Sequence, residues 1–144
     1  MTQIRNVEEF DLLKMEEIEK ECFQDSWCLA MWKGTFTRRD FLGVAIEEKG
    51  KFIGFCAGTV LFENSELLRI ALTQSARGKG YGGKLLDEFM QKAKRQGAEK
   101  IFLEVRATNE VAQNLYKSRG FKETGIRAKY YADGEDAVEM VKTL

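Results

Sequence analysis

The seven residues from Arg77 to Gly83 have the composition of an anion-binding turn. Glycine permits positive φ and a close approach of the backbone, so that its N–H groups can contact a bound phosphate. The neighbouring cations would add favourable charge. Either a phosphate-bearing molecule binds here, or the glycines serve only a tight entry into a helix. The candidate ligand residues are Arg77, Gly78, Lys79, Gly80, Tyr81, Gly82 and Gly83.

Two common phosphate-binding motifs do not fit this turn. A Walker loop needs Ser or Thr after its GK pair, whereas Leu85 follows Lys84. A dinucleotide-binding fold places its glycine turn after the first strand, with an acidic residue about 20 positions later. This turn follows roughly the fourth strand that the sequence predicts. A different kind of phosphate-bearing ligand is therefore indicated.

Glu104 and Tyr116 are the residues best placed to move protons. Glu104 interrupts the apolar run Ile101–Val105, where a carboxylate is unfavourable unless it faces a cleft or is paired. It could act as a general base or form an ion pair with Arg106. Tyr116 could donate a proton or pack as a core aromatic. The chain has no histidine, which excludes imidazole-based catalysis and leaves no base to activate a cysteine nucleophile.

The secondary-structure elements that must position these residues are helices and strands, which alternate along the chain only in its second half. Apolar periodicity of three or four predicts helices, and runs of β-branched and aromatic residues predict strands. The result is a mixed α/β or α+β domain with parallel pairing between the strands at 67–73 and 100–106. The predicted elements are a strand near Ile4, helices at 12–22 and 29–36, a hairpin of 41–47 and 51–62, a strand at 67–73, a helix at 80–96, a strand at 100–106, a helix at 109–119, and strands at 121–127 and 137–144.

Several local signals mark the ends of these elements. Ser26 or Asp25 is the expected N-cap of the second helix, and Thr108 or Asn109 that of the last helix. Gly97 is expected just beyond the end of the helix that follows the glycine turn. Glycines inside the second hairpin strand, Gly54 and Gly58, suggest a bulge or a close backbone approach.

Composition limits the partners of the chain. Residues 1–144 fit a single domain, and 44% hydrophobic with 32% charged residues is an ordinary globular balance. The net charge is zero, which disfavours direct binding of nucleic acid. No apolar run approaches the length of a membrane span, about 20 residues. We expect a cytoplasmic protein that binds no membrane and no metal, with Cys22, Cys28 and Cys56 as free thiols.

The glycine turn resembles a family signature. Arg77-Gly78-Lys79-Gly80-Tyr81-Gly82 fits the R/Q-x-x-G-x-G/A motif of the GCN5-related N-acetyltransferases (GNAT). Leu103–Asn109, Leu115-Tyr116 and Gly120-Phe121 follow in the order of that family. The tail from Ile126 to Met140 is similar to the RimI-type ribosomal-protein-alanine N-acetyltransferases, as are Cys22-Phe23 and Ser26-Trp27. The resemblance extends over essentially the whole chain.

The resemblance implies a fold and a co-substrate. The GNAT fold is a mixed, mostly antiparallel sheet of six or seven strands, splayed around a central parallel pair, with about four helices. Acetyl-CoA would lie in the splay, its pantetheine arm along the backbone of Ile70, Ala71 and Leu72 and its pyrophosphate on the glycine turn. Asn109 would contact the pantetheine and Tyr116 would lie near the sulfur. Glu104 would be the general base and Tyr116 the acid, in a direct attack of amine on thioester.

The acceptor implied by the resemblance is the α-amine of a protein N-terminus, such as an N-terminal Ala of a small-subunit ribosomal protein. Phe23, Trp27, Tyr130 and Tyr131 would form its groove, although hairpin packing explains one of the paired tyrosines equally well. Two alternatives stay open. The acceptor could be a small-molecule amine or a lysine side chain, and the chain could be a non-catalytic acyl-CoA-binding module. We expect a monomer or a weak dimer.

Overall fold

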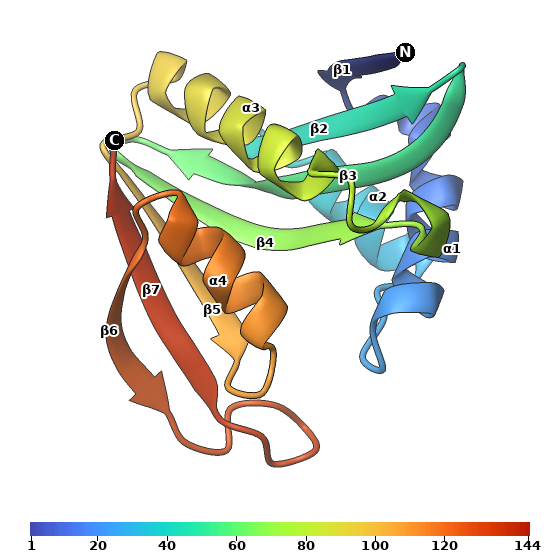
Figure 1. The fold of residues 1–144 in the computed structure, drawn as a ribbon. Coiled ribbons are helices and arrows are strands. Elements are labelled where there is room, and N and C mark those ends of the chain that lie inside the picture. Colours follow the sequence, from blue (N-terminus) through green and yellow to red (C-terminus); the bar gives the residue numbers. More distant parts are fainter.

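The chain forms one seven-stranded sheet, and its helices pack against the two faces of this sheet (Figure 1). The computed structural model describes residues 1–144. The strand order is β1-β2-β3-β4-β5-β7-β6, and every pair is antiparallel except β4–β5. The elements are β1 (Thr2–Asn6), α1 (Leu12–Cys22), α2 (Leu29–Phe36), β2 (Phe41–Glu48), β3 (Lys51–Leu61), β4 (Asn64–Leu72), α3 (Tyr81–Arg95), β5 (Lys100–Arg106), α4 (Glu110–Ser118), β6 (Lys122–Arg127) and β7 (Ala137–Thr143), with short 3₁₀ turns at Glu9–Asp11 and Gln74–Ala76.

This architecture confirms the predicted fold class. A mostly antiparallel sheet surrounds one parallel pair, and four helices lie on its two faces. The β2–β3 hairpin turns at Lys49 and Gly50, both at positive φ, where the sequence predicts it. None of the helices is long and apolar enough to cross a membrane.

The central parallel pair is short, and the two strands separate after it. β4 and β5 pair only from Asn64 to Glu66 and from Lys100 to Phe102. Figure 1 shows the two strands diverging from this point. The sequence-based start of β4 at Leu67 is therefore wrong. Residues 64–66 belong to the strand and make all of its parallel contacts, while the turn lies earlier, where Phe62 adopts positive φ.

A bulge in β4 coincides with the separation. Ala57 of β3 pairs with Arg69 and Gly58 with Leu67, so that Leu68 is an extra residue without a partner. A bulge bends its strand and increases the local twist, which directs the rest of β4 away from β5. A Cβ on Gly58 would lie 2.0 Å from the carbonyl oxygen of Glu66. The close backbone approach predicted from this glycine is confirmed.

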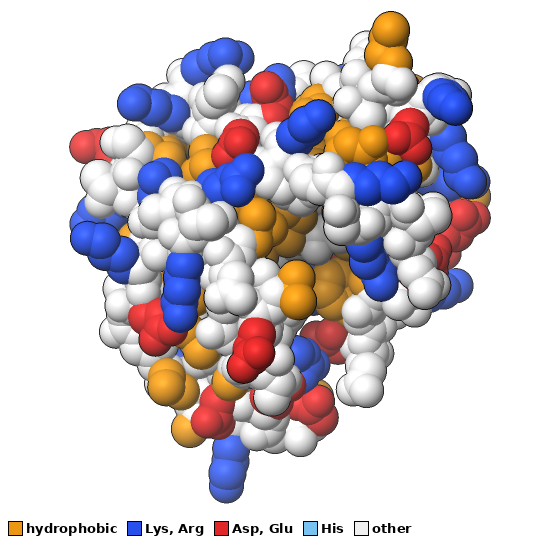
Figure 2. Space-filling model, in the orientation of Figure 1, with side chains coloured by type: hydrophobic (Ala, Val, Ile, Leu, Met, Phe, Trp, Pro, Cys, Tyr) orange, Lys and Arg blue, Asp and Glu red, His pale blue; other side chains and the backbone are white.

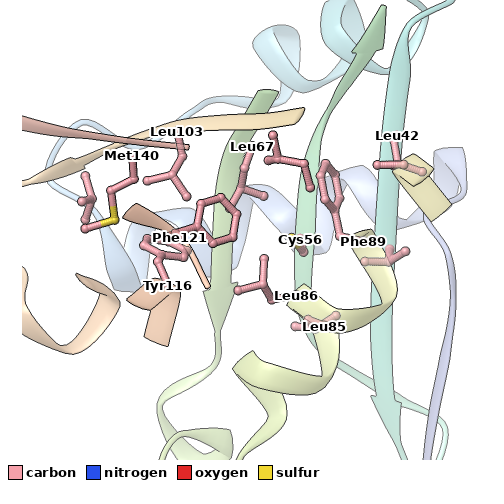
Figure 3. Packing of buried hydrophobic residues seen from close by; sticks show 14 of the residues in the cluster. Leu42, Cys56, Leu67, Leu85, Leu86, Phe89, Leu103, Tyr116, Phe121 and Met140 are labelled. Carbon is pink, nitrogen blue, oxygen red and sulfur yellow. The ribbon is translucent and has the colours of Figure 1, made fainter. Parts of the chain in front are cut away.

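The sheet buries an apolar core on each face. The larger one lies under α3 and α4 and includes Leu85, Leu86 and Phe89 of α3 together with Ile101 and Leu103 of β5. Figure 3 shows Leu86 on the side of Phe121 and Tyr116, and Phe89 on the side of Cys56 and Leu42. The smaller core joins α1 and α2 to β2, β3 and the end of β4 through Trp32, Phe55 and Ala71. The face of β5, β7 and β6 opposite α4 has no helix upon it (Figure 1).

The predicted cap of α2 is wrong. Its N-cap is Cys28, and no side chain within the segment caps the helix. The carboxylate of Glu16 on α1 accepts a hydrogen bond from the backbone N–H of Leu29 at 2.7 Å instead. A carboxylate at a helix N-terminus is favourable whichever element supplies it. The other end signals hold, since Gly97 has φ +100° beyond α3 and the Asn109 side chain caps α4 by accepting from the Ala112 N–H.

Candidate functional site

A cleft of about 400 Å³ occupies the gap between β4 and β5. The two strands form its sides, and α4, the segment between α1 and α2, and the segment between β6 and β7 complete it. Six of the residues predicted to act on co-substrate or acceptor line it, namely Phe23, Ile70, Glu104, Asn109, Tyr116 and Tyr131. The other predicted residues, Trp27, Ala71, Leu72, Tyr130 and the glycine turn, are not part of its lining. The other lining residues are Cys22, Gln24, Asp25, Leu68, Arg69, Val105, Arg106, Ala112, Asp133 and Glu135.

Glu104 lies on the floor of the gap, two residues beyond the last parallel pair. Its neighbours Leu103 and Val105 point into the core under α3 and α4. Alternation along the strand therefore turns Glu104 toward the opposite face. The ion pair with Arg106 does not form, because Arg106 binds Asp133 and Glu135, each at 2.9 Å. No cation lies within ion-pair distance of Glu104, so no salt bridge occupies its carboxylate.

Tyr116 is buried on α4 and reaches the cleft from the other side of the sheet. Its ring packs on Phe121 with 5.8 Å between ring centroids, as a core aromatic would (Figure 3). Its hydroxyl makes no hydrogen bond within the chain. Burial raises the pKa of the Tyr116 phenol well above its usual value, so the hydroxyl stays protonated and remains a donor. The packing role and the donor role are compatible.

The paired tyrosines flank Glu104 in different ways. The Glu104 carboxylate and burial raise the pKa of Tyr130 to about 12. Tyr131 lies over Arg106, whose guanidinium carbon is 4.1 Å from the ring centroid. The two rings meet edge to face at 5.0 Å. Both tyrosines thus border the approach to the carboxylate, although only Tyr131 lines the cleft itself.

Of the two aromatic residues before α2, only Phe23 lines the cleft. Trp27 packs on Trp32 at 4.6 Å between ring centroids, within the core under α1 and α2. Phe23 covers Arg69, with 4.2 Å between the guanidinium carbon and the ring centroid. A direct contact of Trp27 with an acceptor stays a prediction.

The glycine turn lies outside the cleft lining, at the N-terminus of α3. None of the six backbone N–H groups from Gly78 to Gly83 donates to an acceptor in the chain. Gly78 and Gly80 have φ near +80°, which suits glycine. Lys79 and Lys84 form no ion pair. The turn therefore presents unsatisfied donors and positive charge together, as an anion site requires.

Other residues of the turn have structural contacts of their own. The Tyr81 hydroxyl donates to Glu48, and Arg77 contacts the Leu72 carbonyl and the Cys22 sulfur. A Cβ on Gly83 would lie 2.2 Å from the guanidinium of Arg119. A side chain at this position would have to displace the flexible end of Arg119, so the packing of Arg119 favours glycine here.

The cleft contains an ionic network that the sequence-based search missed. Arg69 of β4 donates to the buried Glu19 of α1 at 3.0 Å and to the Asp25 carbonyl at 2.7 Å. The Asp25 carboxylate lies 3.8 Å from Arg69 and 3.7 Å from Arg106 of β5. Asp25 therefore bridges the two separated strands. The sequence does contain a signal for this network, because Arg69 is a charged residue inside the apolar stretch Leu67–Leu72, just as Glu104 interrupts the apolar run of its own strand.

Figure 2 shows the face that carries α3 and α4. Apolar side chains gather in a hollow near its middle, between the regions that Figure 1 assigns to these two helices. Lys and Arg side chains surround the hollow. A ligand with an anionic end and a less polar arm would match this distribution of charge.

The sequence model of the family described as "Acetyltransferase (GNAT) family" matches residues 6–121, which include the glycine turn, the cleft strands and α4. The chain belongs to the GNAT acetyltransferase family. The [ribosomal protein bS18]-alanine N-acetyltransferase of Escherichia coli K12 is 32% identical over 143 residues, covering 97% of this chain and 96% of that protein.

Solved GNAT structures agree with the fold. The crystal structure of the ribosomal-protein-S18-alanine N-acetyltransferase from Escherichia coli superimposes with a TM-score of 0.92 at 30% identity, over 99% of this chain and 94% of that one. Arabidopsis thaliana NAA60 in complex with acetyl-CoA reaches 0.90 at 17% identity, over 100% and 99% of the two chains, which establishes a common fold. The family and these full-length matches make the chain an N-acetyltransferase.

Proposed function

We propose that this GNAT enzyme transfers the acetyl group of acetyl-CoA to the α-amine of a protein N-terminus, and that a ribosomal protein is the acceptor. The observation that carries the proposal is the full-length similarity to the bS18-alanine N-acetyltransferase of Escherichia coli, at 32% identity. The cleft supports it, because an unpaired carboxylate and a protonated phenol lie where the strands separate.

The co-substrate would bind across the face that carries α3 and α4. The free N–H groups of Gly78 to Gly83 would donate hydrogen bonds to the pyrophosphate, and Lys79 and Lys84 would add positive charge. Beyond Glu66, β4 is paired with β3 on one edge only. Apart from the Leu72 carbonyl, which already accepts from Cys22 and Arg77, the free edge of the backbone from Ile70 to Leu72 is therefore available to the pantetheine arm. A backbone N–H there could stabilise the oxyanion. Acetyl-CoA supplies the activated thioester.

Glu104 would take the proton from the attacking amine. An α-amine has a pKa of about 8, whereas a lysine amine has one of about 10.4, so a carboxylate can assist the former more readily at neutral pH. The amine would reach Glu104 from the face opposite α4, between Phe23 and the paired tyrosines. Tyr116, which stays protonated, would donate to the sulfur as the thiolate departs. Direct attack needs no covalent enzyme intermediate.

The test is a thiol-release assay with acetyl-CoA and short peptides that differ in their first residue. Mass spectrometry of the products distinguishes acetylation of the α-amine from that of an internal lysine. A peptide with a blocked N-terminus and one lysine, and a small polyamine, are the controls. Turnover on the controls with none on any free N-terminus would contradict the proposed acceptor.

A further inference from the structure

A second groove adjoins the cleft on the face of the sheet that no helix covers. It has a volume of about 500 Å³ and shares Glu104 with the cleft. Its floor is formed by β5 and β7, with the β3–β4 turn at one side and β6 at the other. The residues that matter here are Leu61, Phe62, Glu63, Glu66, Phe102 and Glu104.

The contacts around Glu104 indicate a direction in which an acceptor chain could leave the cleft. On one side, toward the open ends of the strands, Asp25 lies between Arg69 and Arg106 and bridges the gap. On the other side, β4 and β5 are paired and form a continuous floor at Glu66 and Phe102. An extended chain whose first residue lies at Glu104 can therefore continue along the second groove.

The charges of this groove are unbalanced. Two of its acids are neutralised, since Asp40 pairs with Arg38 at 2.7 Å and Glu139 with Arg127 at 3.2 Å. Glu63, Glu66 and Glu104 have no cationic partner, and no other Lys or Arg lines the groove. Because opposite charges across a contact steer association and fix register, this groove fits a basic segment and repels an acidic one.

Apolar side chains stand exposed beside these acids. Leu61 is 57% exposed, Phe62 81% and Phe102 43%. Phe102 lies two residues from Glu104 on the same strand face, about 7 Å away along an extended backbone. Large exposed aromatics next to a site mark a contact surface more often than isolated ones do. Side chains two to five residues from an acceptor N-terminus would fall within this stretch.

We propose that this groove binds the segment that follows the acetylated residue, and that it selects acceptors with basic and aromatic or aliphatic residues at positions two to six. The inference rests on the proposed N-terminal acetylation. The inference adds the residues that contact the acceptor segment, Glu66 and Phe102, and the kinds of acceptor side chain that they bind.

The experiment compares decapeptides with the same first residue and either Lys and Phe or Glu and Ser at positions two to six. The basic peptide should have the lower KM. Glu66→Lys should raise its KM about three- to tenfold, as expected for reversing one exposed charge, and Glu66→Gln should raise it less. Phe102→Ala should raise the KM as well. Glu9→Lys, an equal charge change on a distant 3₁₀ turn, is the matched control.

Equal KM values for the two peptides, or a KM for the basic peptide that Glu66→Lys does not raise, would overturn the groove while leaving N-terminal acetylation intact. Added salt should reduce the difference between the peptides, because it screens exposed charges. The absence of acetylation on every peptide would contradict the proposed function itself, and with it the occupant assigned to the groove. Calorimetric binding of the basic peptide to the CoA-bound enzyme gives a readout that needs no turnover.

Discussion

Glu104 of β5 lies directly opposite Glu139 of β7 in the antiparallel pairing of the two strands. Arg127 neutralises Glu139 at 3.2 Å, whereas Glu104 has no cationic partner. Like charges opposite one another destabilise a sheet, so the stability of the fold does not account for a carboxylate at this position. Its place at the floor of the cleft agrees with the general-base role that we propose for it.

Replacing this carboxylate should therefore separate activity from stability. In Glu104→Gln, kcat should fall about 10²-fold or more through loss of the general base. The free energy of unfolding should stay equal or rise by a few tenths to about 1 kcal/mol as the repulsion disappears. Thiol release and urea denaturation measure the two quantities, with CoA affinity as a further check. Glu123→Gln on β6 is the control, and an undiminished rate in Glu104→Gln would exclude the base role.

Tyr116→Phe tests the proposed acid. The ring remains, so the packing on Phe121 is preserved, and no hydrogen bond within the chain is lost with the hydroxyl. The free energy of unfolding should change by less than about 1 kcal/mol, because the Tyr and Phe side chains fill nearly the same volume. Turnover should fall about 10²-fold if the phenol donates to the leaving thiolate. A full rate in a stable Tyr116→Phe protein would leave Tyr116 with its packing role alone.

The glycine turn offers a substitution that probes the ligand rather than the fold. A Cβ on Gly82 would meet only Leu115 at 3.5 Å and Leu72 at 4.0 Å, both ordinary contacts, whereas Gly80 has φ +82° and would be strained by any side chain. Gly82→Val should thus weaken CoA binding about tenfold or more by obstructing the N–H groups, with little loss of stability. Calorimetry with CoA measures it. Gly34→Ala, in open space on α2, is the control, and unchanged CoA affinity would refute the placement of the pyrophosphate.

The buried pair Glu19–Arg69 should respond strongly to removal of one member. The Glu19 side chain is fully buried and also accepts from the Trp27 N–H at 2.9 Å. Arg69→Met leaves that carboxylate without its cation, which should lower the free energy of unfolding by about 3–5 kcal/mol. Adding Glu19→Gln should restore part of the loss. Urea denaturation of the two single variants and the double variant forms a cycle, and additive effects would show that the two residues do not interact.

Glu135 should make stability depend on acid. Hydrogen bonds from the Thr108 hydroxyl and N–H, and then from Arg106, lower the pKa of Glu135 to about 2. The pKa of Glu135 in the folded protein lies below its value of about 4.3 in the unfolded chain. The stabilisation is therefore fully present above about pH 4.3 and is lost as the pH falls toward 2. Denaturation of the wild type and Glu135→Gln at several pH values measures it. The difference in stability should be constant between pH 7 and 5.5 and should shrink on acidification. A difference independent of pH would contradict the shifted pKa.

Local sequence signals predicted most of the fold. The apolar spacing of Leu12, Met15 and Ile18 gave α1 its bounds, and Lys49-Gly50 gave the hairpin, because both depend on neighbours in the chain. The start of β4 was wrong, since its parallel partner lies 36 residues away and leaves no local mark. The cap of α2 failed for the same reason, because Glu16 acts from another helix.

The same distinction between local and distant signals applies to the residues of the candidate site. Glu104, Tyr116 and the glycine turn belong to contiguous motifs and were predicted from the sequence, and the structure places the first two in the cleft lining. The network of Glu19, Asp25 and Arg69 was missed, because Arg69 and Glu19 are 50 positions apart and meet only when β4 passes beneath α1. Glu19 follows Met15 by four residues, on the apolar side of α1, where a carboxylate needs a buried partner.

The unpaired Leu68 of β4 also bears on how such a sheet could arise. Deleting one residue at this point would restore the register of β4 with β3 and remove the bend that separates β4 from β5. β4 and β5 could then form hydrogen bonds along their whole length, which would give a continuous sheet without a cleft. One extra residue in β4 thus accompanies the opening that holds the candidate site, so a one-residue insertion could turn a closed sheet into one with a cleft.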